Sequence, residues 1–139
     1  MDREDFYALV FRAAAFYTAA WGAGMALFPD LLFDVLGLPR SAYPVLASGT
    51  GVMVGAFAYA CWVVSRDPRR HPELVALGLL TRTLGVLVWA WYAWLGQIPM
   101  RALWISALQD GVWIPFFAAC LLWQRRTRME ELIARAGTG

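Results

Sequence analysis

The sequence contains no lysine, a single histidine and only two cysteines. The twelve basic residues are therefore all arginines, and most of them lie between apolar runs rather than along one face. This distribution is typical of membrane topology signals and argues against nucleic-acid binding. The histidine, His71, lies in a polar loop, so the apolar runs hold no histidine pair for haem and no histidine-rich di-iron site. Cys61 and Cys120 form neither a CxxC motif nor the cysteine framework of a secreted mini-protein.

The usual motifs of catalysis are absent as well. The sequence has no paired aspartate motif for prenyl transfer, no serine or cysteine placed with a base for nucleophilic catalysis, and no predicted metal site. An enzyme would have to work with Asp110, Arg82 and a tyrosine such as Tyr59 or Tyr17. Acid–base isomerisation of a lipid could use such a set. Because no pattern requires a reaction, the sequence favours a protein that is not an enzyme.

Apolar sequence makes up most of the chain. Hydrophobic residues account for 60% and charged residues for 16%, whereas soluble domains average about 45–50% and about 25%. The apolar residues fall into four runs, at residues 6–28, 44–64, 73–95 and 102–123. Each run has roughly the 20 residues that cross a bilayer core. We therefore predict an all-α integral membrane protein, with residues 1–139 forming one domain, a four-transmembrane-helix bundle.

The first apolar run is expected to stay in the mature protein. A cleavable signal peptide has a basic start and an uninterrupted apolar stretch. Here residues 1–5 are mainly acidic, and Arg12 interrupts the run.

A short helix is predicted between the first two spans. Residues 31–36 are mostly apolar but too few to cross a bilayer. Asp30 is expected to cap this helix at its start, and Gly37 followed by Pro39 to end it. We predict that it lies in the membrane interface; a cover over a pocket is the alternative.

The arginines also predict the orientation of the chain. With four spans, the N-terminus, the 65–72 loop and the C-terminal tail share one side, which carries eight arginines against Arg40 and Arg101 on the other. The positive-inside rule then places both termini in the cytoplasm. The Arg69–Arg70 pair is interpreted as a topology signal, with a lipid-headgroup or partner site as the alternative. Residues 124–136 show helical spacing, which predicts an interfacial helical tail.

Three charged residues fall inside the predicted spans: Arg12, Arg82 and Asp110. Each costs about 2.5–3.5 kcal/mol at a helix centre, so such residues usually face the bundle interior and have a partner. The tight turn at residues 96–99 should make the third and fourth spans antiparallel neighbours. We therefore predict an Arg82–Asp110 ion pair, whose role is either structural or that of a ligand or proton site. Arg12 either reaches the headgroups or joins the same cluster.

The fourth span should bend beside Asp110. Pro115 has no N–H to donate to the Gly111 carbonyl, and this leaves a free carbonyl near the carboxylate. Irregular backbone at this depth is tolerated only where protein buries it or where water reaches it. The residues predicted to line a ligand-binding site are Arg82, Asp110, Gln109, Tyr59, Tyr17, Arg12 and Trp113.

Small residues in the second run predict close helix packing. Gly51 and Gly55 match the small-xxx-small pattern. Packing within the bundle is the preferred interpretation, and a dimer face is the alternative. Cys61 and Cys120 are expected to be free thiols packed near the inner ends of their spans.

Several short motifs occur in a fixed order. They are Gly37-Leu-Pro39 with Tyr43-Pro44, Gly51 to Gly55, Asp67 to His71, Gly78 to Arg82, and Asp110 with Trp113 to Phe116. In this order they resemble a widespread family of small four-span bacterial inner-membrane proteins of uncharacterised function. Arg82 stands where that family is expected to carry lysine, and Gln109 where it is expected to carry asparagine. The resemblance implies the fold, the orientation and a bacterial inner (plasma) membrane, but no activity.

Three functions remain open from the sequence. The first is a protein that binds a lipid, quinone or isoprenoid between its helices, or that serves as an accessory subunit. The second is a lipid- or isoprenoid-modifying enzyme with Asp110 as acid or base. The third is a dimeric proton-coupled transporter. The expected partners are membrane lipids and a hydrophobic small molecule, and no cofactor is evident beyond such a bound molecule. A homo-oligomer and a larger membrane complex both stay open.

Overall fold

The computed structural model describes residues 2–37 and 44–136, and these residues are helical except for short turns. Pro39, Arg40 and Tyr43, on which part of the sequence argument rests, lie outside the described residues. The elements are α1 (Arg3–Leu27), α2 (Pro29–Leu36), α3 (Pro44–Arg66), α4 (Pro72–Trp94), α5 (Ala102–Gln109), the 3-10 turn η1 (Gly111–Trp113) and α6 (Ile114–Ala136). The predicted all-helical class is confirmed, and α1, α3 and α4 agree closely with the first three apolar runs. The fourth run, 102–123, is divided among α5, η1 and the first part of α6.

The helix ends follow local chemistry. The Asp2 carboxylate accepts the Asp5 N–H at 2.8 Å and caps α1, while α3 and α4 begin at prolines, which suit a first helical turn. Gly96 has φ +70° and ends α4 in a turn that closes with a bond from the Gln97 N–H to the Tyr92 carbonyl.

The short helix α2 differs in one detail from the expectation. It begins at Pro29, so Asp30 lies in its first turn and is not the N-cap residue. Proline takes this position because a first-turn N–H has no partner within the helix. Gly37 ends α2 in the left-handed conformation, with φ 64°, as predicted.

Within the described parts of the chain, three helical segments are long and apolar enough to cross a membrane: α3, α4 and the segment from Ala102 to Ala136. Helix α1 has 25 residues but is not among the three. Arg12 and the polar or small residues of α1 lower its mean hydropathy, whereas α3 and α4 carry more valine and leucine. These three segments support the membrane prediction. The composition of α1 does not by itself make it a fourth span.

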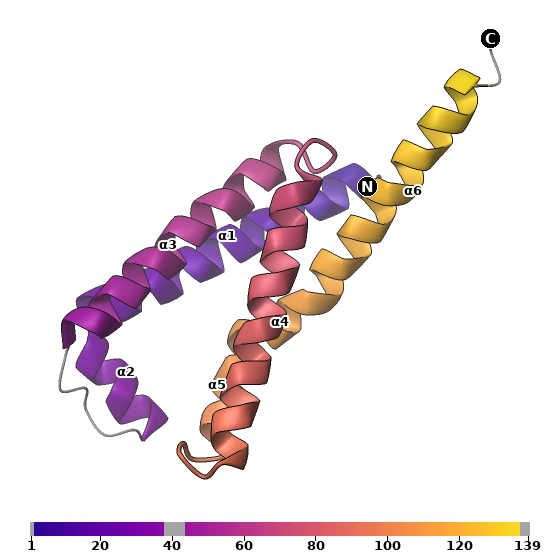
Figure 1. Cartoon of the computed structure of the whole chain (residues 1–139). Helices are drawn as coiled ribbons and strands as arrows, with labels where there is room; N and C mark the ends of the chain where they lie inside the picture. The colour runs from indigo at the N-terminus through magenta and orange to yellow at the C-terminus, as the bar shows by residue number, and fades with distance from the viewer. Residues whose placement is uncertain (1, 38–43, 137–139) are drawn as a thin grey trace.

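The long helices form two pairs rather than an evenly closed bundle. Helix α1 packs along α3, while α4 packs along α5 and α6, and contacts between the pairs are fewer. The pairs meet near the N-terminus and the 67–71 turn, and they diverge toward α2 and the turn after α4 (Figure 1). We call the end where they meet the basic end, because Arg66, Arg69, Arg70 and Arg125 lie there.

Glycine allows the α1–α3 pair to pack closely. A Cβ atom on Gly22 would lie 2.6 Å from the Gly55 nitrogen, and one on Gly51 would lie 2.7 Å from the Gly22 carbonyl oxygen. Neither position has room for a side chain. The small-residue motif therefore packs within the chain, as its preferred interpretation predicted.

The apolar core lies in the half of the molecule near the basic end. It includes Phe11 and Phe117, whose ring centroids are 4.6 Å apart, together with Val64 and Val75. Cys61 and Cys120 are free and buried in the same region, as predicted. This core joins α1, α3, α4 and α6 at the basic end, and the two pairs diverge beyond it (Figure 1).

At the diverging end, α2 extends from the α1–α3 pair toward the turn that links α4 and α5 (Figure 1). The guanidinium of Arg101 lies directly against Gly37, where any side chain would collide with it. A cation at a helix C-terminus interacts favourably with the helix dipole. This contact links the two pairs at the end away from the core. No described residue of α2 lines the cavities described below, so whether α2 lies in the interface or covers a pocket stays a prediction.

Beyond the core, α6 continues without interruption to Ala136. The helical character of residues 124–136 is therefore confirmed. Their position along a membrane surface stays a prediction.

Candidate functional site

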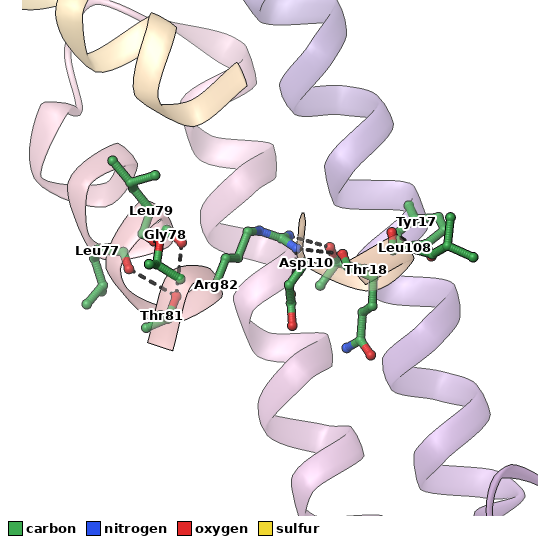
Figure 2. Close-up of polar contacts among 11 residues, drawn as sticks. Tyr17, Thr18, Leu77, Gly78, Leu79, Thr81, Arg82, Leu108 and Asp110 are labelled. Atoms are coloured by element: carbon green, nitrogen blue, oxygen red, sulfur yellow. Dashed lines mark hydrogen bonds and ion pairs between the residues drawn. The ribbon is translucent and has the colours of Figure 1, made fainter. Parts of the chain in front are cut away.

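The predicted ion pair connects α4 to Asp110, the residue that follows α5. Arg82 extends from α4, and its Nη1 lies 2.9 Å from the Asp110 Oδ1 (Figure 2). The Arg82 side chain is 4% exposed and that of Asp110 is 22% exposed. The pairing is confirmed, and the charges lie between helices, as charges in membrane segments usually do.

The fourth predicted span is interrupted next to this pair. Helix α5 ends at Gln109, and α6 begins only at Ile114. In the intervening turn the Trp113 N–H donates to the Asp110 carbonyl, three residues back, at 3.1 Å. The helix is therefore broken within one turn of Asp110, where we predicted a bend. The Gly111 carbonyl is not free, however, because it accepts the Ile114 N–H.

Two carbonyls at the end of α5 are instead bound by side chains from other helices. The Gln109 carbonyl accepts Arg82 Nη1 at 3.0 Å. The Leu108 carbonyl accepts the Tyr17 hydroxyl at 3.4 Å. Unwound backbone inside a membrane needs such partners because no water replaces them. The arginine thus neutralises Asp110 and also stabilises the helix break.

Thr18 is a member of the cluster that the sequence analysis missed. Its hydroxyl accepts Arg82 Nη2 at 3.0 Å, and the residue is 6% exposed. One signal was available, because Thr18 directly follows Tyr17 in the middle of the first apolar run. Gly85, one turn beyond Arg82, leaves room for the Asp110 carboxylate. A Cβ atom at Gly85 would lie 3.2 Å from the Asp110 Oδ2.

Aromatic rings enclose the guanidinium. The Arg82 Cζ lies 5.3 Å from the ring centroid of Phe117, 5.6 Å from that of Phe57 and 5.9 Å from that of Trp113. Cation–π contacts strengthen when water is excluded. Within the described part of the chain, Arg82 Nε is buried and has no hydrogen-bond partner. The rings therefore stabilise the Arg82 guanidinium, whose Nε lacks a hydrogen bond to any described residue.

A cavity of about 330 Å³ lies beside the ion pair, between the two helix pairs. Apolar surface makes up most of its wall, and polar atoms contribute a small part. Its lining comes from α1, α3, α4 and the end of α5, and comprises Thr18, Thr50, Met53, Val54, Phe57, Thr81, Arg82, Gln109 and Asp110.

Five of the seven predicted site residues gather around this cavity or its ion pair. Arg82, Asp110 and Gln109 line the cavity. The rings of Tyr17 and Trp113 pack together behind them, with centroids 5.7 Å apart.

The other two predicted residues, Arg12 and Tyr59, lie elsewhere. Tyr59 is 71% exposed and lines a different cavity near the 67–71 turn. It follows Phe57 by two residues, which is about 200° around a helix, so it faces away from Arg82. Arg12 is exposed on α1 and does not line the cavity. Arg12 precedes Thr18 by six residues, a rotation of about 240° around the helix, so the two side chains lie on different faces of α1.

No group of three histidine, cysteine or acidic side chains suited to a metal ion occurs among residues 2–37 and 44–136. In comparisons with known proteins, the chain matches no protein-family model, no curated protein and no solved structure.

Proposed function

We propose that this protein is a multi-pass bacterial inner-membrane protein that binds a hydrophobic molecule with a polar end. The candidate ligands are a lipid, a quinone or an isoprenoid. The observation that carries the proposal is the mostly apolar cavity beside the buried Arg82–Asp110 pair. Apolar pockets with a few convergent polar groups are the usual form of small-molecule sites. The same site would serve an accessory subunit of a larger complex.

In this proposal α1 is the fourth span and both termini are cytoplasmic. Its 25 residues extend about 37 Å, enough to cross a bilayer core. It packs along α3, which is itself apolar enough to span. It also exposes large apolar side chains, among them Phe16 (68%) and Leu27 (70%), which would contact lipid. The arginines of the basic end support the orientation.

The polar end of the ligand should be neutral and should carry a hydrogen-bond donor. Asp110 already balances the charge of Arg82 through Oδ1, so an anion is not needed. Thr50 and Thr81 donate their hydroxyl protons to backbone carbonyls of their own helices. Their oxygens and the Asp110 Oδ2 therefore remain as acceptors beside the cavity. A hydroxyl group, as in an isoprenoid alcohol, a quinol or a glycerolipid with a free hydroxyl, matches such a set. Among quinones this favours the reduced quinol, because the oxidised form carries only acceptors.

The two other functions have less support. In a lipid-modifying enzyme, Asp110 would be the acid or base. One of its two carboxylate oxygens is already bound to Arg82. A dimeric proton-coupled carrier usually needs an acidic residue that is accessible from both sides of the membrane, whereas Asp110 is paired with the guanidinium of Arg82.

Filling the cavity tests the proposal. Val54→Trp places a large ring in the cavity wall, and Val52→Trp, two residues away on an outward face with 64% exposure, is the matched control. Each protein is purified in mild detergent, and its bound molecules are identified by mass spectrometry and absorbance. We expect wild type and Val52→Trp to retain a hydroxyl-bearing hydrophobic molecule and Val54→Trp to lose most of it. Equal retention by both variants, or no such molecule on wild type, would contradict the proposal.

A further inference from the structure

A second and larger cavity lies at the basic end of the molecule. Its volume is about 670 Å³, and it lies between the start of α4 and the outer part of α6. Four arginines and two glutamates contribute to its lining, and Ala76 and Leu121 add apolar surface. Those six charged residues are Arg69, Arg70, Arg125, Arg128, Glu73 and Glu131.

The geometry of one wall is fixed by contacts within the protein. The Gln124 side chain, 6% exposed, donates through Nε2 to the Pro68 carbonyl and so holds the 67–71 turn against α6. Arg69 pairs with Glu4 at 2.8 Å and lies over the Trp123 ring at 5.5 Å. This anchored turn positions the neighbouring Arg70 at the cavity.

The other wall presents two arginines on one face of α6. Arg125 and Arg128 are three residues apart, so their side chains are neighbours on the helix surface. Within residues 2–37 and 44–136, no ion pair with Arg70, Arg125 or Arg128 occurs. These guanidinium groups therefore retain their capacity for bidentate bonds to phosphate oxygens.

Two further features favour an anion with hydroxyl groups. Helix α4 starts here at Pro72 without a side-chain cap, so the positive end of its dipole faces the cavity. The Gln124 Oε1 is buried and has no partner among the described residues, and it can accept a hydroxyl proton. Glu73 and Glu131 are acceptors too, but the four arginines outnumber them.

We propose that this cavity binds the phosphate of an anionic membrane lipid whose headgroup carries hydroxyls, as in a phosphatidylglycerol. The apolar residues Ala76 and Leu121 would face the first part of its acyl chains. Because α4 and α6 leave the predicted membrane at this level, a lipid reaches the cavity from the bilayer. This site is distinct from the cavity beside Asp110 and does not depend on the function proposed for it.

The test compares two double variants of the full chain. Arg125→Gln with Arg128→Gln removes two cavity arginines, and Arg3→Gln with Arg126→Gln removes two from the same side that do not line the cavity. Both lower the basic count on that side equally, so a topology effect would appear in both. Purified protein in neutral detergent is titrated with dioleoyl phosphatidylglycerol, and bound lipid is counted by native mass spectrometry.

Each arginine near an anionic lipid contributes about fivefold in affinity, so the cavity variant should bind phosphatidylglycerol about 25-fold more weakly than wild type. The control variant should stay close to wild type. Equal weakening in both variants would overturn the proposal, as would equally tight binding of dioleoyl phosphatidylethanolamine. Displacement of the lipid by millimolar inorganic phosphate would show a site for free phosphate and would overturn it too.

Discussion

The guanidinium of Arg82 donates to the Gln109 carbonyl at 3.0 Å, at the residue where α5 ends. A residue of one helix thus provides the hydrogen bond that another helix loses at its interruption. The same nitrogen also contacts the Asp110 carboxylate. The charge pair and the broken helix are therefore one structural unit, and a change in either should affect the other.

The first prediction concerns the pair itself. Removing one partner of a buried ion pair typically costs about 3–5 kcal/mol, because the remaining charge is uncompensated. Asp110→Asn should be the worse single change, since Arg82 stays charged, whereas Asp110 left alone by Arg82→Leu can bind a proton. The double variant should recover much of the lost stability. Thermal unfolding of all four proteins in one detergent gives the coupling energy. Additive single effects would show that the two residues do not act together.

The second prediction concerns Thr18. Thr18→Val removes the partner of Arg82 Nη2 and should cost about 1–3 kcal/mol, the usual penalty for a buried donor left unsatisfied. The control is Thr83→Val, because the Thr83 hydroxyl donates only to the Leu79 carbonyl of its own helix. The midpoint of thermal unfolding should fall clearly for the first variant and little for the second. A similar fall in both would mean that the Thr18 contact contributes nothing specific.

The third prediction concerns the α1–α3 contact. Gly22→Ala should force the two backbones apart, since the new methyl group would lie 2.6 Å from the Gly55 nitrogen. We expect a loss of about 1–3 kcal/mol, as for other overpacked sites. Gly55→Ala is the control, because a Cβ there meets no atom within 4 Å. Unfolding in detergent measures both variants, and tolerance of Gly22→Ala would show that the helices are farther apart than described.

The fourth prediction concerns the number of spans. If α1 crosses the membrane as a fourth span, reporters fused at the N-terminus and at residue 139 should lie on the same side, because an even number of spans then separates them. The fusion at residue 139 should be cytoplasmic, on the side of the arginines. Reporters on opposite sides would exclude α1 as a span and leave the three segments that are apolar enough to cross.

The sequence by itself determined the helices and the central charge pair. Helix ends are marked by Pro44, Pro72, Gly37 and Gly96. Proline is disfavoured inside a helix, and glycine adopts the left-handed conformation that ends one, so the helix bounds could be predicted. Arg82 and Asp110 could be paired in advance because opposite charges in adjacent apolar helices have few other partners.

Only the tertiary structure decided how these helices face one another. The sequence predicted a four-helix bundle and put Tyr59 and Arg12 among the site residues, with Arg12 reaching the headgroups as the alternative. The helices form two diverging pairs, and neither side chain lines the cavity. The participation of Thr18 was not predicted. In a soluble helix the polar face reveals which side meets the core, but a membrane helix is apolar on most sides. Its rotation is therefore set by close contacts. The Gly51–Gly55 spacing indicated the close packing of α3 but not that Gly22 is its partner, and the contact of Phe11 with Phe117 leaves no periodic signal in the sequence.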